Sequence, residues 1–376
     1  MTTSFDVAIV GGGLLGWSAA YRLVKAGLSV CVADLIQEGV ATNAGAGIIA
    51  PGTSVRISPA GLLIGGAAVQ YYPELLAELG SDGETNTGYS TVGALFVARD
   101  DDEADRLAGV KQIMLERRDG GMANIGEVTE LSGAEARMLF PALSNLPGAL
   151  HASAAARVNG RLLRDALRNA AERHGAKLVL GKADITTDGS SATGIFVDGE
   201  QIAAGQVLIC GGAWSAAVGE QLDVPIPLHP QRGQIIHLEM RGQDTSAWPI
   251  VVGFHSHYLL TFPTSRVVAG ATREHESGFD PRVTAGGVAE VLGEAFTVAE
   301  GLKPAAILEM RVGLRPFCKD EQPVLGQAPG WQNIFISTGH GPSGLQLGPV
   351  SSAAVVDQML GHTPRFDLAP FSAARF

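Results

Sequence analysis

The chain has 376 residues, a net charge of −11 and 46% hydrophobic residues, which predicts about two domains with sizeable cores. Its acidic balance, without any run of basic residues, argues against nucleic acid as a partner, because neutralising phosphates needs clustered Lys and Arg. We expect no membrane span, since no apolar run is long enough, and no signal peptide. The three cysteines, Cys31, Cys210 and Cys318, form no CxxC pair, which favours a cytoplasmic location.

The first 34 residues predict a strand–helix–strand unit. Residues 5–10 form a β-branched, apolar run typical of a strand that is buried on both faces. Apolar residues then recur at helical spacing from residue 14 to 26, and Gly27 is the predicted end of that helix. Residues 29–34 predict a second buried strand, which ends at Asp34.

Three glycines and one acid in this unit match a dinucleotide-binding pattern. Gly11 permits a tight turn, Gly13 lets a pyrophosphate approach the backbone, and Gly16 lets the helix and strand pack closely. The helix N-terminus offers N–H groups to phosphates, and Asp34 can accept hydrogen bonds from a ribose. The predicted cofactor-binding residues of the unit are Gly11, Gly13, Leu14, Leu15, Gly16, Asp34 and Leu35. The unit alone does not distinguish FAD from NAD.

Residues 39–52, GVATNAGAGIIAPG, are mostly small, which allows the backbone to approach a flat ligand closely. This segment resembles the second cofactor-contacting stretch of the D-amino acid oxidase superfamily, which includes glycine oxidase, D-amino acid dehydrogenases and sarcosine oxidases. The resemblance spans nearly the whole chain, and its most diagnostic segments are GLRP at 313–316 and TGHG at 338–341. Further matching segments lie at 156–178, 207–215, 229–238 and 258–274.

The resemblance implies an α/β fold in which a Rossmann-like FAD-binding domain is interleaved with an α+β substrate domain built on a mixed sheet. We expect residues 1–50, 145–216 and 305–376 to form the FAD-binding domain, and residues 51–144 and 217–304 to form the substrate domain. FAD is expected to bind non-covalently, because Cys318 does not stand at the offset of the cysteine that attaches the flavin in sarcosine oxidases. The other FAD-binding residues that the resemblance implies are Thr42, Asn43, Ala44, Gly45, Ala46, Gly47, Ile48, Ala183, Gly211, Gly212, Trp214, Arg315, Gly341, Pro342, Ser343, Gly344, Leu345 and Gln346. Ser343 also fits the N-cap of the helix that follows.

The resemblance also implies residues that contact the substrate. Arg315 matches the arginine that binds the substrate carboxylate in much of the family, and its planar fork suits a carboxylate. The alternative for Arg315 is a structural ion pair at the domain junction. Tyr258 matches a position where family members often place a tyrosine over the substrate, although an ordinary strand tyrosine is an equal alternative. Arg311 is either a second carboxylate anchor or a surface charge.

Two histidines, His255 and His257, stand just before Tyr258 and would share one face of a strand. We expect no metal site, because no acid or cysteine lies nearby in the sequence and a flavin enzyme needs no metal. His257 is predicted as a catalytic residue that lines the pocket, since histidine titrates near neutrality and amine substrates lose a proton before hydride transfer.

Together these features predict an FAD-dependent oxidase or dehydrogenase. It would transfer hydride to flavin N5 from a D-amino acid, or from a cyclic or secondary amino acid, and give an imine that hydrolyses to a keto acid. Sarcosine oxidase-like demethylation of an N-methyl amine and glycine oxidation are alternatives within this class. An alternative from another class is a flavoprotein subunit of a larger complex. Oxygen or another acceptor would reoxidise the flavin, and a homo-oligomer is compatible with the sequence.

Overall fold

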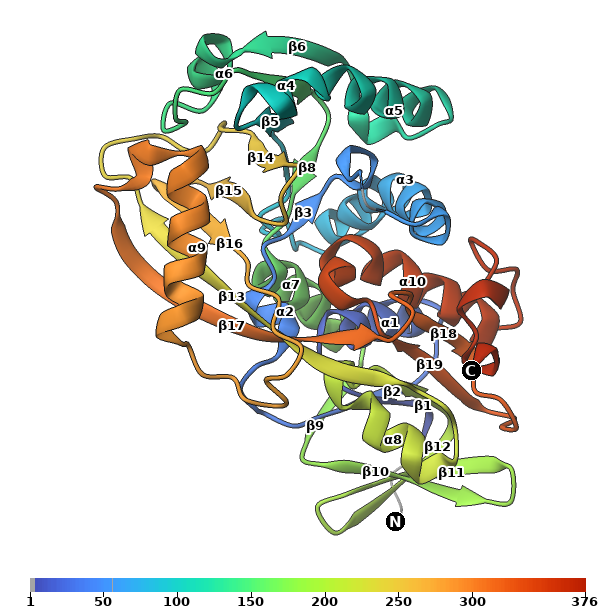
Figure 1. The fold of residues 1–376 in the computed structure, drawn as a ribbon. Coiled ribbons are helices and arrows are strands. Elements are labelled where there is room, and N and C mark those ends of the chain that lie inside the picture. The colour runs from blue at the N-terminus through green and yellow to red at the C-terminus, as the bar shows by residue number, and fades with distance from the viewer. Residues whose placement is uncertain (1–3, 56) are drawn as a thin grey trace.

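A parallel sheet with flanking hairpins forms the lower half of the molecule in Figure 1. The computed structural model describes residues 4–55 and 57–376. The path of this first sheet is β10–β11–β12–β1–β2–β9, with β19 beside β12 and β18 beside β19. Strands β9, β2, β1, β12 and β19 run parallel, as the predicted strand–helix–strand unit requires. The strands are β1 (Ser4–Val10), β2 (Val30–Asp34), β9 (Lys177–Leu180), β10 (Ala183–Asp188), β11 (Ser191–Val197), β12 (Glu200–Ile209), β18 (Val324–Gln327) and β19 (Ile334–Thr338).

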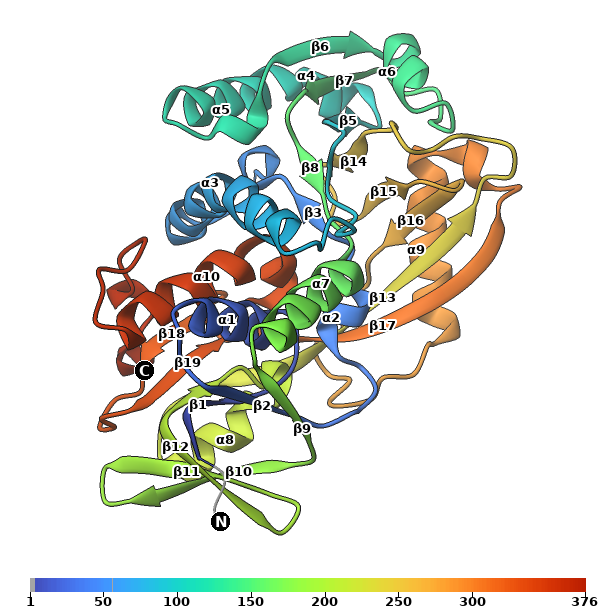
Figure 2. The ribbon, with the colours of Figure 1, turned by 180° about the vertical axis from the view of Figure 1, so that it is seen from behind.

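Helices α1 (Leu14–Lys25), α7 (Gly160–Arg173) and α10 (Gly344–Met359) cover one face of this sheet (Figures 1 and 2). Helix α3 (Pro59–Ser81) packs on α10 and lies farther from the sheet in both views. Helix α1 begins at the predicted residue and ends one residue early, and Gly27 follows with φ +88°. Its buried face, including Trp17, Leu23 and Val24, packs with apolar residues of the sheet and of the other helices. Helix α8 (Ser215–Leu222) packs against the opposite face of the sheet.

The second sheet is mixed, as expected. Its order is β17–β13–β16–β15–β14–β5–β7–β6, in which β14 and β5 run parallel and the other neighbours run antiparallel. Helix α9 (Ala285–Val298) packs on this sheet through Val291 and Ala295. The strands are β5 (Ala94–Ala98), β6 (Val128–Ser132), β7 (Gly148–Ala152), β13 (Leu228–Glu239), β14 (Ile250–Gly253), β15 (Tyr258–Phe262), β16 (Arg266–Gly270) and β17 (Ala306–Cys318).

Small elements connect the two sheets. A three-stranded sheet has the order β3 (Ile48–Ile49), β8 (Ala156–Arg157) and β4 (Ser90–Thr91). The short helix α2 (Ala41–Ala44) lies beside β17, and helices α4 (Asp101–Asp105), α5 (Leu107–Asp119) and α6 (Gly133–Leu139) lie around β5 to β7 (Figure 1). Within residues 4–55 and 57–376, no helix combines the length and apolarity needed to cross a membrane.

The chain passes between the two large sheets several times, which agrees with an interleaved arrangement. Two strands do not follow the predicted domain boundaries. The residues of β7 and β17 fall in segments predicted for the FAD-binding domain, but both strands belong to the second sheet. Only three residues separate β7 from β8, whereas the polar turn at residues 319–323 separates β17 from β18. The division into an FAD-binding and a substrate domain stays a proposal, with β7 and β17 moved to the second.

Close packing between α1 and the turn after β1 depends on Gly16. A Cβ atom at this position would lie 1.9 Å from the carbonyl oxygen of Gly11. We expect Gly16→Ala to lower the free energy of unfolding by about 1–3 kcal/mol, the usual cost of overpacking a rigid core. Chemical unfolding measures this change.

Gly109 provides the matched control, because it is exposed within α5 and a Cβ there would meet nothing within 4 Å. Gly109→Ala should raise the unfolding free energy by roughly 0.5–1 kcal/mol through better helix propensity. Equal effects of the two substitutions would contradict the packing role of Gly16.

Candidate active site

A cavity of about 780 Å³ lies where the first sheet meets β13 and β17. Its volume falls in the range of roughly 300–1,000 Å³ that is common for ligand pockets. Residues at the carboxyl ends of β1 and β2 line it, which is the usual position of ligands in open α/β sheets. Further lining residues come from 40–42 and 44–48, from the turns after β9 and β12, from α8, from parts of β13, β15 and β17, from Arg273 and from the turn before α10.

The turn between β1 and α1 has the geometry of a phosphate-binding turn. Gly11 adopts φ +110°, and a Cβ there would lie 2.5 Å from the carbonyl oxygen of Cys210. Gly13 is the N-cap residue of α1 and lines the cavity with Gly11, Leu14 and Leu15. Gly16 does not line the cavity, because it faces Gly11 inside the turn. The N-terminus of α1 therefore points its amides toward the cavity, where anions are stabilised.

Asp34 ends β2 beside this turn and lines the cavity together with Leu35. The amide of Gly12 donates a 2.9 Å hydrogen bond to Asp34 Oδ1. Burial raises the pKa of Asp34, whereas the Gly12 amide and the charge of Arg164 act in the opposite direction. The carboxylate is thus fixed next to the phosphate-binding turn, where a ribose contact is expected.

The small-residue segment forms one long wall. Thr42, Ala44, Gly45, Ala46, Gly47 and Ile48 line the cavity. Thr42 Oγ1 accepts a 3.1 Å hydrogen bond from the amide of Leu14, which ties this wall to α1. Asn43 was predicted here but does not line the cavity, because its Oδ1 accepts a 2.8 Å bond from Arg164 on α7.

The opposite wall contains Ala183, Gly211, Gly212 and Trp214. At the start of α10 the lining includes Gly341, Pro342, Gly344, Leu345 and Gln346. Ser343 lies outside the lining, and its side chain makes no capping hydrogen bond although it stands at the N-cap. Gln346 Oε1 accepts a 3.0 Å bond from the amide of Ala50 and so connects the two walls.

This lining fits a dinucleotide cofactor. A Cβ on Gly13 would approach only Thr42 Oγ1, at 3.5 Å, so the backbone at this point is open to the cavity. Gly47, with φ +95°, has the carbonyl oxygen of Val158 where its Cβ would stand, at 1.8 Å, so no side chain can project there. Cys318 is buried and lies outside the lining, in agreement with a flavin that is not attached to it.

Arg315 reaches the cavity from β17. Its Nη1 donates 2.9 Å hydrogen bonds to Gln231 Oε1 and to the carbonyl oxygen of Thr272, so both partners are neutral. A Cβ on Gly233 would lie 2.3 Å from Arg315 Nη2, which means that the guanidinium fills the space a side chain would take. Burial lowers the pKa of Arg315 and the charge of Arg273 acts in the same direction, whereas Tyr258 and Glu274 act in the opposite direction. The structural ion pair considered for Arg315 is absent among the described residues.

Tyr258 begins β15 and lines the cavity together with Arg315. Burial raises the pKa of its hydroxyl, while Arg315 and Arg273 oppose that shift. A Cβ on Gly270 would lie 2.7 Å from the hydroxyl oxygen, so Gly270 makes room for the ring. Tyr258 remains a neutral hydrogen-bond donor near neutral pH.

The structure places His257 away from this cavity. It lines a small neighbouring pocket behind Tyr258, and its Nε2 lies 3.3 Å from Glu290 Oε1 on α9. His255 Nε2 lies 2.8 Å from Glu103 Oε1. The two histidines precede β15 in a bend rather than in a strand, so their spacing does not give them a common face. The acids that hold them come from distant segments, which the sequence could not reveal.

Several residues that line the cavity had not been predicted. Arg273, Gly233 and His340 are the most informative. Burial lowers the pKa of His340 to about 3, so its imidazole is neutral, and neither ring nitrogen has a hydrogen-bond partner in the described part of the chain. Arg311, which had been considered as a second anchor, lies outside the lining and donates to Glu309 Oε1 at 2.5 Å.

Comparisons with known proteins agree with this site. Residues 6–358 match a family model described as FAD dependent oxidoreductase. The chain is 40% identical over 367 residues to "Uncharacterized oxidoreductase YurR" of Bacillus subtilis, covering 97% of this chain and 98% of that protein. It is 29% identical to a glycine oxidase of Geobacillus kaustophilus, covering 100% of this chain and 98% of the relative.

The similarity extends to solved structures. Iminodiacetate oxidase from Chelativorans sp. BNC1 superposes with a TM-score of 0.93 at 38% identity, covering 97% of this chain and 98% of that one. Glycine oxidase from Geobacillus kaustophilus superposes with a TM-score of 0.88 at 28% identity over the full length of both chains. The cavity, the fold and these matches together show that the chain belongs to the D-amino acid oxidase family of FAD-dependent oxidoreductases and that its cofactor is FAD.

Proposed function

We propose that the chain oxidises the C–N bond of a small amino acid whose carboxylate binds Arg315. The single observation that carries this proposal is the guanidinium of Arg315 in the cavity wall over Gly233. Both hydrogen bonds found for Arg315 within the described chain use Nη1 and go to neutral acceptors. An anionic ligand bound to Arg315 would therefore add a charged partner to these two neutral acceptors. Planar guanidinium groups suit this role because they bind carboxylates through two parallel hydrogen bonds.

Tyr258 is the second group proposed to act at the substrate. Its hydroxyl stays protonated and can donate a hydrogen bond to the same carboxylate, while its ring forms part of the wall. When bound, FAD supplies the oxidant that accepts a hydride from the substrate carbon next to nitrogen. The residues of the chain bind and orient the substrate, and the imine that forms is hydrolysed by water.

The similar proteins support this reaction class. One solved neighbour is an iminodiacetate oxidase and another is a glycine oxidase, and both names describe oxidation of a carboxylate-bearing amine. A D-amino acid or a cyclic or secondary amino acid is the proposed substrate, and glycine oxidation and N-methyl amine demethylation are the alternatives. A flavoprotein subunit without its own activity is the alternative from another class. Oxygen or another acceptor, a homo-oligomer and a cytoplasmic location remain proposals.

A substrate panel tests this function directly. Purified holoenzyme is mixed anaerobically with D-amino acids, glycine, sarcosine, prolines and iminodiacetate, and loss of the flavin absorbance is followed. The proposal expects at least one carboxylate-bearing amine to bleach the flavin. Failure of the whole panel would support the inactive subunit instead.

Arg315→Ala should reduce kcat/KM for the best substrate by roughly 30-fold to several-thousand-fold, because removing one partner of a desolvated charge pair costs about 2–5 kcal/mol. Arg315→Lys should lose less, since it keeps the charge but not the planar fork. Steady-state kinetics measures both variants, and the flavin absorbance of each variant checks that the cofactor is still bound.

The matched control is Arg241→Ala, because the Arg241 side chain is 82% exposed on a surface turn. This variant should keep the wild-type kcat/KM. Unchanged turnover in Arg315→Ala would remove Arg315 from the substrate site. Loss of flavin from Arg315→Ala would assign the arginine to cofactor binding.

The pH dependence should come from the substrate rather than from the chain. His340, with a pKa lowered to about 3, and Tyr258, with its pKa raised by burial, both stay neutral between about pH 6 and 9. Hydride transfer requires a free amine, so kcat/KM should rise with pH up to the ammonium pKa of the substrate. Two substrates with different ammonium pKa values should therefore show different midpoints. A midpoint shared by both substrates would instead indicate a base of the protein.

A further inference from the structure

We propose that Arg273 forms a second carboxylate-binding group in the same cavity, so that the preferred substrate is a secondary amine with a carboxylate on each side of its nitrogen. This inference rests on the proposed oxidation of a carboxylate-bearing amine. It names the substrate class through a residue that the predicted site did not include. Arg273 lies on the segment between β16 and α9 and lines the cavity with Arg315, Tyr258 and Gly233.

The backbone shows why the Arg273 side chain faces the cavity. Residues 272–274 pair antiparallel with β13: the amide of Arg232 donates to the carbonyl of Glu274 at 2.9 Å, and the Glu274 amide donates back at 3.0 Å. The Thr272 amide donates to the carbonyl of Gln234 at 3.3 Å. Arg273 is therefore the cross-strand neighbour of Gly233. Side chains alternate along such a ladder, so Arg273 and Gly233 share the face opposite to their neighbours.

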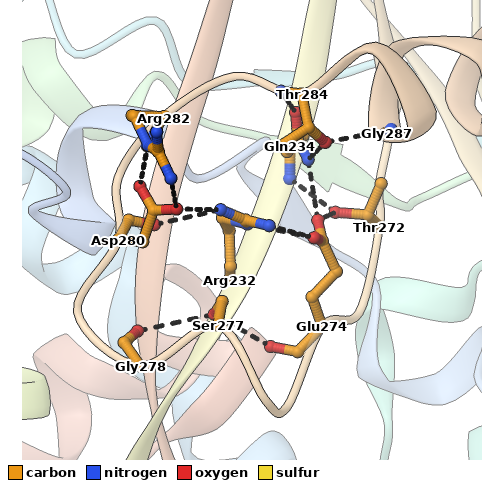
Figure 3. Close-up of polar contacts among 10 residues, drawn as sticks. All are labelled: Arg232, Gln234, Thr272, Glu274, Ser277, Gly278, Asp280, Arg282, Thr284 and Gly287. Carbon is orange, nitrogen blue, oxygen red and sulfur yellow. Dashed lines mark hydrogen bonds and ion pairs between the residues drawn. The ribbon is translucent and has the colours of Figure 1, made fainter.

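Figure 3 shows what occupies the other face. Glu274 Oε1 accepts 2.7 Å hydrogen bonds from Thr272 Oγ1 and Gln234 Nε2, and Glu274 Oε2 accepts a 3.0 Å bond from Arg232 Nε. Arg232 also pairs with Asp280 at 3.0 Å, and Asp280 pairs with Arg282 at 2.9 Å. This polar network, made of Arg232, Gln234, Thr272, Glu274, Asp280 and Arg282, fixes both neighbours of Arg273 to β13. Its members are positioning residues, and they hold Arg273 on the cavity side.

The charges of the polar network balance among themselves. Two arginines, Arg232 and Arg282, pair with two carboxylates, Glu274 and Asp280. These carboxylates lie in the network and are not part of the cavity lining. Arg273 and Arg315 line the cavity on the side of the ladder opposite to these carboxylates.

Both arginines are neighbours of Gly233. Arg315 fills the volume where a Gly233 side chain would stand, and Arg273 is the direct neighbour of Gly233 across the strand pair. Cross-strand neighbours have Cβ positions about 5 Å apart. The charge of Arg273 lowers the pKa of Arg315, so the two guanidinium groups act on each other as like charges, and a bound anion opposes that repulsion. Two carboxylates on one substrate would match two guanidinium groups.

A substrate of this class also suits the reaction. Iminodiacetate and related N-carboxymethyl amino acids carry two carboxylates on the two arms of one secondary amine, and a solved neighbour with 38% identity is an iminodiacetate oxidase. A hydride leaves one methylene carbon for FAD, which is reduced by two electrons, and the nitrogen lone pair forms the C=N bond. Water then adds to that carbon and the C–N bond breaks. The products are a 2-oxo acid and a primary amino acid that keeps the second carboxylate.

The test compares iminodiacetate with sarcosine, which lacks one carboxylate but keeps the secondary amine. Wild-type holoenzyme should have a kcat/KM for iminodiacetate at least about tenfold above that for sarcosine. Arg273→Ala should lower kcat/KM for iminodiacetate by about 10- to 100-fold and change that for sarcosine by less than about threefold, since a charge-assisted hydrogen bond is lost only with the second carboxylate. Arg273→Lys should restore part of the loss, and Arg241→Ala is the surface control.

Binding without turnover gives an independent readout. Thiodiacetate and (methylthio)acetate are sulfur analogues of the two substrates and have no amine to oxidise. Titration of the flavin spectrum should show that Arg273→Ala weakens thiodiacetate binding by about 10- to 100-fold and leaves (methylthio)acetate binding within about threefold. This comparison also shows that the variant still binds flavin and keeps its cavity.

The outcomes separate this inference from the proposed function. In Arg273→Ala, the loss of kcat/KM or of binding could be equal for the compound with two carboxylates and the compound with one. That result would show that Arg273 and Arg315 bind the same carboxylate, which overturns the dicarboxylate inference. Preference for a monocarboxylic amine with dependence on Arg315 alone would overturn it too and leave the proposed function standing. Failure of every carboxylate-bearing amine to reduce the flavin would overturn both.

Discussion

The antiparallel pairing of β13 with β17 is the constraint on which the site depends. The register joins Leu228 to Cys318 at one end and Glu239 to Ala306 at the other. These two strands run from the outer edge of the second sheet to the first sheet (Figure 1). Arg315 therefore enters the cavity from a strand that belongs to the second sheet, while the phosphate-binding turn belongs to the first. A change of register by one residue would turn Arg315 to the other face of the strand pair.

Within this strand pair, the lack of a side chain at Gly233 makes room for the guanidinium of Arg315. Arg315 is paired with Gln231, and its guanidinium extends over Gly233, two residues along β13. Gln231 and the carbonyl of Thr272 fix Nη1, so the orientation of the fork is set before a ligand binds. Preorganisation of this kind reduces the ordering cost that binding must overcome. The same glycine is the cross-strand neighbour of Arg273, and one backbone position thus relates both cationic groups.

Local patterns predicted the parts of the site that are formed by short segments of chain. Three such parts are each continuous in sequence: the strand–helix–strand unit that ends at Asp34, the small-residue wall, and the turn before α10. Steric contacts explain why glycines stand in these segments. Gly16 was assigned to cofactor binding from the glycine pattern, and Asn43 and Ser343 from the resemblance, but none of the three lines the cavity. For Arg315, the resemblance implied the position, whereas its neutral partners became visible only in the fold.

The parts that the sequence could not predict depend on distant pairing. His257 was expected to share a strand face with His255, but a bend precedes Tyr258, and acids from α4 and α9 hold the two side chains. Arg273 follows β16 in a segment whose ladder with β13 is too short to show any alternation in the sequence. Arg311 was considered as an anchor because it lies two residues before GLRP. Its guanidinium instead donates hydrogen bonds to Glu309 Oε1 and to the carbonyl oxygen of Asn43 in α2. Of these two arginines, only Arg273 lines the cavity.

The cavity uses different means to attract negative charge at its two ends. At the phosphate-binding turn the groups are backbone amides and the end of a helix, because no Lys or Arg stands within the turn itself. At the proposed substrate end, Arg273 and Arg315 line the cavity, although the chain as a whole has a net charge of −11. An acidic protein surface repels a substrate that carries two negative charges. Arginine side chains that line a low-dielectric cavity attract the same substrate over short distances. Glu274 faces away from the cavity on this ladder, and Asp280 pairs with Arg232 on the same side, so neither carboxylate lines the cavity beside the two arginines.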